Sequence, residues 1–230
     1  MIIIDQITIQ QLNNTTIEHT SEQPLLVRVF AHLLSYIFHP LFIPLYVSLF
    51  LLYVHPSYFA GYDLYDKFWL PLRVSYATIF LPLFTVFLLW RLKFIDSMFL
   101  KTQKDRVIPY IVSNIYFFWL FWVFKNDPGV PNIMTSFIFG VFIVSSAALI
   151  ANAFFKISMH AIAMGGMLAL FLIILQQNTM LMTVPLCIAL LIAGLVCTAR
   201  LIISDHQPRE IYWGLIIGIA CQFIAALIFL

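Results

Sequence analysis

Five ionisable side chains lie between Arg200 and Glu210, at the boundary between two long apolar segments. Three of them combine into a recognisable chemistry. The guanidinium of Arg200 presents a planar fork of donors that suits phosphate oxygens. His206 has the Glu210 carboxylate four residues on, and such a pair fixes an imidazole in one tautomer and keeps its other nitrogen as nucleophile or base. We therefore predict a phosphate site here, with Asp205 and Arg209 as solvated neighbours.

Two earlier polar segments hold similar side chains. Lys101 and Arg106 precede one apolar stretch, and Ser158 and His160 open another. Lysine, arginine and serine side chains donate hydrogen bonds to phosphate oxygens, and histidine transfers protons near neutral pH. The three segments together predict a basic pocket for an anion. Lys104 and Lys156 are interpreted as interfacial charges, although Lys104 can replace Lys101.

Expected helix starts add a second argument. Ser158 is a suitable N-cap, and Pro109 and Pro208 are expected in the first turn of a helix, where the missing N–H of proline costs nothing. Three helix N-termini on one face would offer unpaired N–H groups and partial positive charge to phosphate. With Pro208 first in its helix, Glu210 is third, and its carboxylate is expected to fold back toward His206.

The composition places the chain in a lipid bilayer. Hydrophobic residues make up 63% and charged residues only 10% of the 230 residues, and the mean hydropathy is +0.99. A water-soluble globule of this size needs more polar surface. A membrane-spanning helix needs about 20 apolar residues. Seven stretches meet or approach that length, which predicts an all-α fold: a polytopic membrane helix bundle with six to seven transmembrane helices. The stretches are 29–54, 70–90, 108–124, 133–153, 160–175, 181–203 and 211–230.

Alternation of these spans across the bilayer puts the segments 91–107, 154–159 and 204–210 on one face, where nearly all the candidate residues gather. Spans 108–124 and 160–175 are short, so we expect one of them to be buried inside the bundle.

Residues 1–28 lack the basic start and apolar run of a signal peptide. The chain is accordingly divided into a polar N-terminal arm, residues 1–28, and a transmembrane domain, residues 29–230, that contains the candidate phosphate site. His39, next to Pro40 in the first span, is ionisable at membrane depth. It either lines a path for lipid or stands at an interior kink.

The three polar segments resemble the signature of the type 2 phosphatidic acid phosphatase family. That signature reads Lys-x6-Arg-Pro, then Pro-Ser-Gly-His, then Ser-Arg-x5-His-x3-Asp. The third part is the best match in this chain: Arg200 and His206 are in register, Glu210 stands in place of the Asp, and Ala199 in place of the Ser.

The other two parts depart further from the signature. Ser158 and His160 are retained in the second part, but Met159 replaces the Gly and brings a side chain toward the expected phosphate position. In the first part Lys101 and Pro109 keep the family's separation. Ile108 occupies the Arg position there, and Arg106 comes two residues early.

The resemblance implies a phosphatase that works without a metal or other cofactor. By similarity, His206 would attack phosphorus to form a phosphohistidine, Glu210 would orient it, and His160 would protonate the leaving oxygen and then activate water. The phosphate oxygens would be held by four further side chains, those of Lys101, Arg106, Ser158 and Arg200.

The leading hypothesis is an integral membrane phosphatase for a lipid phosphate or prenyl diphosphate, whose tail stays among the membrane lipids. The alternative is a non-enzymatic binder or transporter of an anionic lipid or phosphate. A phosphotransferase would share the covalent step but use an acceptor other than water. The basic residues are scattered between the spans, so nucleic acid is not an expected partner. The sequence indicates neither the headgroup nor an oligomeric state.

The expected location is the cell (inner) membrane. Nine of the twelve Lys and Arg residues lie on the candidate face. The positive-inside rule makes that face cytoplasmic, whereas the family resemblance favours the opposite side. The two arguments leave the orientation open. The nine residues are Arg28, Arg91, Lys93, Lys101, Lys104, Arg106, Lys156, Arg200 and Arg209.

Overall fold

The computed structural model describes residues 23–98, 100, 103–177, 180–203 and 207–230. Within these ranges the chain is almost entirely helical and contains no strand. Seven helical segments are long and apolar enough to cross a membrane, which confirms the all-α membrane bundle. They are Leu25–Val54, Leu64–Arg91, Lys104–Lys125, Asn132–Phe154, Met159–Gln177, Thr183–Ile202 and Pro208–Phe229.

The first two spans are composed of several shorter helical pieces. The first contains α2 (Leu25–Ile37), η1 (Pro40–Phe42), α3 (Ile43–Leu49) and η2 (Phe50–Val54), and η3 (Pro56–Phe59) follows it. The second contains α4 (Leu64–Ser75), η4 (Tyr76–Phe80) and α5 (Leu81–Arg91). The other spans are single helices: α6 (Gln103–Lys125), α7 (Asn132–Phe154), α8 (Met159–Gln177), α9 (Thr183–Ile202) and α10 (Pro208–Phe229).

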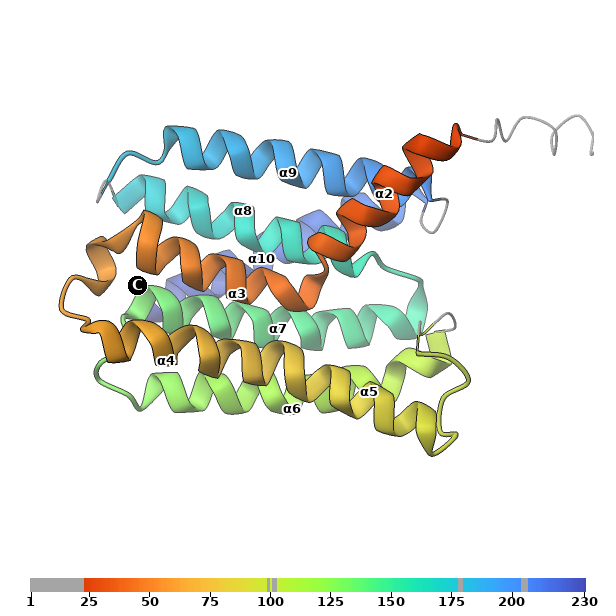
Figure 1. The fold of residues 1–230 in the computed structure, drawn as a ribbon, viewed down its shortest axis with the longest axis horizontal. Coiled ribbons are helices and arrows are strands. Elements are labelled where there is room, and N and C mark those ends of the chain that lie inside the picture. Colours follow the sequence, from red (N-terminus) through yellow and green to blue (C-terminus); the bar gives the residue numbers. More distant parts are fainter. Residues whose placement is uncertain (1–22, 99, 101–102, 178–179, 204–206) are drawn as a thin grey trace, which may run out of the picture.

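The bend between α2 and α3 has a local cause. His39 has extended backbone angles, φ −62° and ψ 139°, as a residue before proline prefers. Its Nδ1 accepts a hydrogen bond from the Leu41 N–H at 3.4 Å. The helix therefore stops before Pro40 and restarts in a new direction, as the angle between α2 and α3 shows in Figure 1.

The expectation that Pro109 begins a helix is wrong. α6 starts at Gln103, so Pro109 is in the helix interior, within its second turn. Hydropathy marks only the lipid-length part of a helix, and the polar residues before it are also good helix formers. Asp105 in the first turn further suits the positive end of the helix dipole. Pro208, in contrast, is the first residue of α10, as predicted.

Helix α8 is the buried centre of the bundle, and eleven of its 19 residues are buried. This confirms that one of the two short spans is enclosed. Glycines let α10 approach α8 at backbone distance: a Cβ on Gly218 would stand 2.2 Å from the Ile162 carbonyl oxygen, and one on Gly214 would stand 2.9 Å from the Ser158 carbonyl oxygen. Close backbone contact at small residues is a common way for membrane helices to pack.

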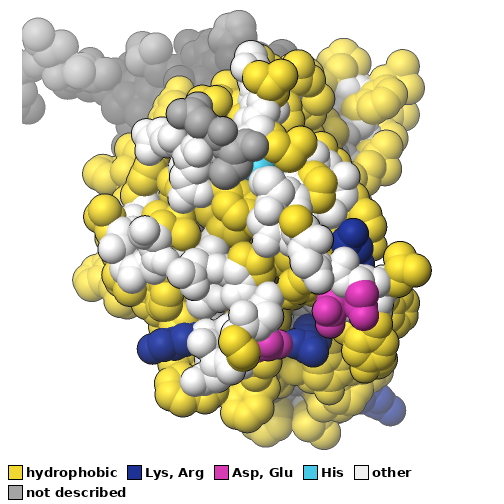
Figure 2. Space-filling model, turned by 90° about the vertical axis from the view of Figure 1, so that its left-hand side faces the viewer, with side chains coloured by type: hydrophobic (Ala, Val, Ile, Leu, Met, Phe, Trp, Pro, Cys, Tyr) yellow, Lys and Arg dark blue, Asp and Glu magenta, His cyan; other side chains and the backbone are white. Residues whose placement is uncertain are grey.

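The C-terminal ends of α5, α7 and α9 and the starts of α6, α8 and α10 lie at one end of the bundle, the right-hand end in Figure 1, as the alternation of spans predicts. The C-terminus lies at the other end. That opposite end is seen in Figure 2, where hydrophobic side chains are widespread, the charged ones are few, and some acidic and basic side chains lie side by side. Among its charges, Arg73 and Asp127 form an ion pair of 2.9 Å.

Candidate active site

A cavity of about 230 Å³ opens among the helices at the end of the bundle where α8 begins and α9 ends. Three predicted site residues from three different helices line it: Arg106 of α6, His160 of α8 and Arg200 of α9. None of the described residues that line it is a carboxylate. The described lining residues therefore contribute positive charge to the cavity and no negative charge. The other lining residues are His39, Pro40, Leu41, Pro82, Val86, Leu100, Pro109, Tyr110, Ser113, Phe117, Ser145, Ile157 and Met159.

The displaced arginine of the first segment is on the cavity side of α6. Because the helix already includes residue 106, Arg106 faces the cavity while Ile108, at the family's arginine position, is 41% exposed on another face. The Nε of Arg106 donates to the Leu100 carbonyl oxygen at 2.8 Å. Leu100 has a positive φ of 49°, a costly conformation for leucine. This strained turn directs a carbonyl toward the arginine and helps to hold its guanidinium.

Arg200 lies in the last turn of α9 and is partly buried. Its guanidinium is close enough to the guanidinium of Arg106 and to the imidazole of His39 for electrostatic interaction with both groups. Two guanidinium groups beside one cavity repel each other, and an anion between them relieves that repulsion. The pair therefore favours a ligand that carries negative charge and presents several acceptor oxygens.

His160 is the first-turn residue of α8 and is buried. Its Nε2 lies 3.0 Å from the Ser35 carbonyl oxygen of α2. A carbonyl oxygen only accepts, so Nε2 carries hydrogen and donates it. The other ring nitrogen, Nδ1, is then the one whose protonation can change. The ring of His39 lies next to that of His160, with centroids 5.6 Å apart.

Ser158 caps α8 instead of lining the cavity. Its Oγ accepts from the Ala161 N–H at 3.4 Å, and the residue is fully buried, so the predicted N-cap is confirmed. Its own N–H donates to the Glu210 backbone carbonyl at 3.4 Å. This contact ties the start of α8 to the start of α10, which brings the second and third polar segments together.

Glu210 occupies the third position of α10, and its carboxylate folds back as expected. Oε2 accepts from the Gln207 N–H at 3.3 Å, within a capping box. The predicted contact with His206 lies outside the described residues, as do Lys101 and His206 themselves. Glu210 lines a separate, more open hollow together with Lys156 and Arg209.

Lys156 belongs to the same electrostatic group. It lies in the connection between α7 and α8 and is partly exposed. Burial lowers the pKa of its ammonium group, as do the charges of Arg106 and Arg200, while Glu210 opposes that effect. A lysine interpreted from the sequence as an interfacial charge thus adds to the positive potential of the candidate site.

Several cavity residues were not singled out from the sequence. Tyr110, Ser113 and Phe117 follow Arg106 at intervals of three or four residues, so they share its face of α6. This spacing could have identified the three residues from the sequence. Ser145 of α7 carried none, because only the packing of α7 against other helices brings it to the cavity. His39 lines the cavity and also stands at the bend of the first span.

The fold and this site together define an integral membrane protein with a cationic cavity at one end of a helical bundle. Residues 131–230 match a family model described as the PAP2 superfamily. The match confirms the resemblance over that part of the chain and supports phosphatase-type hydrolysis of phosphate esters. It includes the second and third segments but not the first, which departs furthest from the signature. Neither curated proteins nor solved structures gave a match.

Proposed function

We propose that this protein is a lipid phosphate phosphatase that hydrolyses a lipid phosphate or diphosphate at the 230 Å³ cavity. The observation that carries the proposal is the convergence of Arg106, His160 and Arg200 on one cavity, where no lining residue that the structure describes is a carboxylate. Guanidinium groups bind phosphate oxygens through paired, charge-assisted hydrogen bonds. The cavity lies inside a membrane bundle, which favours a substrate whose tail remains in the apolar phase.

The proposed reaction has two steps. A ring nitrogen of His206 attacks phosphorus, the bond between phosphorus and the lipid oxygen breaks, and His160 gives a proton to the leaving oxygen. Water then loses a proton to His160 and attacks the phosphohistidine, which releases inorganic phosphate and restores both histidines. Glu210 orients His206 in this scheme.

The phosphate oxygens are held mainly by Arg106 and Arg200, with Lys101 and Ser158 as further donors. The Ser158 side chain is buried and caps α8. Its hydroxyl would therefore contact a phosphate oxygen only after a ligand binds. These residues complete the reaction without a metal in the proposed scheme. Lys156 raises the local concentration of anionic substrate through its charge.

The proposal is tested by phosphate release from purified protein in detergent, with a chelator present and a panel of lipid phosphates. Vanadate should inhibit, because it mimics the phosphorus centre in its transition state. Replacing His206, His160 or Arg200 by alanine should abolish turnover. Matched controls are His32→Ala and Arg209→Ala, since both side chains are exposed and line no part of the cavity.

Binding of lipid phosphate without turnover would instead support the binder or transporter hypothesis. In that case a His206→Gln variant, which can hydrogen-bond but cannot carry phosphate, would keep its function. Transfer of phosphate to an alcohol in preference to water would indicate a phosphotransferase.

The side of the membrane is tested separately in cells. We propose the cell (inner) membrane, with the basic end of the bundle in the cytoplasm as the positive-inside rule favours. A single cysteine at Arg209, in a variant without the native cysteines, should then resist an impermeant thiol reagent until the membrane is opened. Rapid labelling of intact cells would place the site on the outer side.

A further inference from the structure

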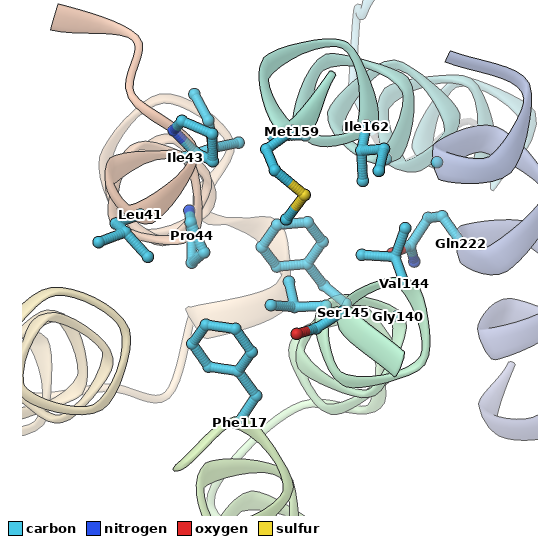
Figure 3. Close-up of a pocket in the computed structure, with 16 residues that line it drawn as sticks. Leu41, Ile43, Pro44, Phe117, Gly140, Val144, Ser145, Met159, Ile162 and Gln222 are labelled. Atoms are coloured by element: carbon cyan, nitrogen blue, oxygen red, sulfur yellow. The ribbon is translucent and has the colours of Figure 1, made fainter. Parts of the chain in front are cut away.

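We call the 230 Å³ cavity lined by Arg106, His160 and Arg200 the phosphate cavity. A second, smaller cavity of about 80 Å³ adjoins it on its interior side. The two share lining residues on η1, α6, α7 and α8, among them Phe117, Ser145 and Met159. Its walls are otherwise almost wholly apolar, with Ile43, Val144 and Ile162 around its centre (Figure 3). A lipid held by its phosphate between Arg106 and Arg200 would extend its first carbon atoms in this direction.

One polar side chain stands out in this apolar wall. Gln222 of α10 is only 2% exposed, and its Nε2 has no hydrogen-bond partner among the residues that the structure describes. Figure 3 shows it reaching from α10 toward Gly140 and Val144 of α7. A buried donor without an acceptor is costly, and native proteins seldom leave one unless something else supplies the acceptor.

The backbone around Gln222 leaves room for its amide. A Cβ on residue 140 would stand 2.2 Å from Oε1 of Gln222 and 3.0 Å from its Cδ. Glycine at this position therefore allows the amide to lie against α7. Any larger residue would displace it.

The distance along α8 between the phosphate cavity and the apolar cavity also suits a substrate that occupies both. His160 lines the phosphate cavity and Gly166 the apolar one, and the offset of six positions between them corresponds to about 9 Å along α8. The side chain of Gln222 further tilts toward the start of α10, which is the phosphate end. An acceptor just beyond the headgroup phosphate comes within reach of the amide.

We propose that Gln222 is a specificity-determining residue that donates a hydrogen bond to an ester carbonyl of the lipid substrate. This rests on the proposed phosphatase function. Acyl esters of glycerol phosphate carry carbonyl oxygens a short glycerol backbone away from phosphorus. A prenyl phosphate or a dialkyl ether has no carbonyl there, so it would leave the amide without an acceptor. The site therefore selects acyl ester lipids over ether and prenyl ones.

The test compares two glycerol phosphates of equal chain length that differ only in ester or ether linkage, in detergent micelles. We expect the protein to prefer the ester in kcat/KM by about tenfold, the value of one buried hydrogen bond. Gln222→Met keeps the side-chain length but removes the donor, and should bring the ratio close to one by lowering the ester rate alone. Gly140→Ala should lower the same ratio by displacing the amide.

Gln177→Met is the matched control, because Gln177 is exposed at the far end of the bundle. It should keep the full ester preference. Equal rates on ester and ether in the unchanged protein, or a preference that survives Gln222→Met, would overturn the proposal and leave water as the partner of Gln222. Absence of turnover on every substrate would count against the phosphatase function. Gln222 is then still tested by the melting-temperature shifts that the ester and ether phosphonates produce.

Discussion

Replacing Arg200 by methionine should weaken catalysis and strengthen the fold at the same time. Arg200 and Arg106 carry like charges that interact beside the cavity, and none of the described residues lining it is a carboxylate. With a phosphate bound, each charge-assisted hydrogen bond from Arg200 contributes about 1.5–3 kcal/mol. A two-pronged contact, partly compensated by water and by Arg106, comes to about 3 kcal/mol. We therefore expect kcat/KM to fall by about a hundredfold.

The empty protein should respond in the opposite direction. Methionine fills a similar volume, removes a partly buried cation and relieves its repulsion with Arg106. The free energy of unfolding should rise by about 1 kcal/mol, which corresponds to an increase in Tm of about 2–4 °C for a chain of this length. Vanadate should raise the Tm of the unchanged protein but have little effect on the variant.

The assay is phosphate release from a lipid phosphate together with thermal unfolding, with and without vanadate. Arg209→Met is the matched control, because Arg209 is exposed and lies outside the cavity. It should leave activity and Tm close to those of the unchanged protein. The reasoning is refuted if Arg200→Met keeps its kcat/KM. It is also refuted if activity and Tm fall together, since Arg200 would then hold the bundle together instead of binding phosphate.

Three more predictions concern the surroundings of the site. Gly218→Val should lower the free energy of unfolding by about 3 kcal/mol or more, because the new Cβ would stand 2.2 Å from a carbonyl oxygen of α8. The control Gly194→Val has open space around it and should unfold at nearly the normal temperature. His160→Gln should lower kcat by a factor of about 10²–10⁴ with little change in Tm. Glutamine can still donate a hydrogen bond to the Ser35 carbonyl oxygen but cannot transfer a proton. A variant with normal activity would exclude His160 as the acid and base. Burial and neighbouring cations lower the pKa of Lys156, so its charge is lost at a lower alkaline pH than for an ordinary lysine. KM for an anionic substrate should rise through that pH range, and Lys156→Arg should remove the rise; an identical pH profile in the variant would contradict this.

Much of the fold could be predicted from the sequence because a bilayer imposes few solutions. Long apolar stretches must form helices whose backbone groups are satisfied internally, and their alternation decides which connections share an end. One of the two short spans, 108–124 and 160–175, was also expected to be buried, and the structure shows that it is the second, α8. Helix ends were harder: Gln103 to Arg106 continue α6 beyond its apolar part, so Pro109 was placed wrongly at its start.

The site was predictable where one helix face or one capping pattern sets the geometry. Ser158 and Glu210 take their expected capping positions for such local reasons. Arg106 was expected to reach the pocket from a displaced position, and the early start of α6 explains how it does so. By contrast, the Ser35 carbonyl reaches His160 from 125 residues away in the sequence, and no local pattern signals such a contact.

Gln222 illustrates the same limit. An isolated glutamine in an apolar stretch resembles many buried polar residues. Its proposed role becomes apparent only from its position in the structure. Gln222 lies opposite Gly140, beside an apolar cavity that adjoins the cavity lined by Arg106 and Arg200. That position depends on the packing of α10 against α7, which hydropathy does not describe.

The central claim, that a histidine beside this cavity carries phosphate during hydrolysis, is tested most directly by trapping the intermediate. Protein mixed with lipid phosphate labelled in its phosphorus is quenched within one turnover, and the label on the protein is then mapped. The account predicts an N-linked phosphate on His206 that is stable to base and labile to acid, absent from His206→Ala and reduced in Arg200→Met. Release of phosphate with no labelled protein at any time, or label on a residue other than His206, would contradict it.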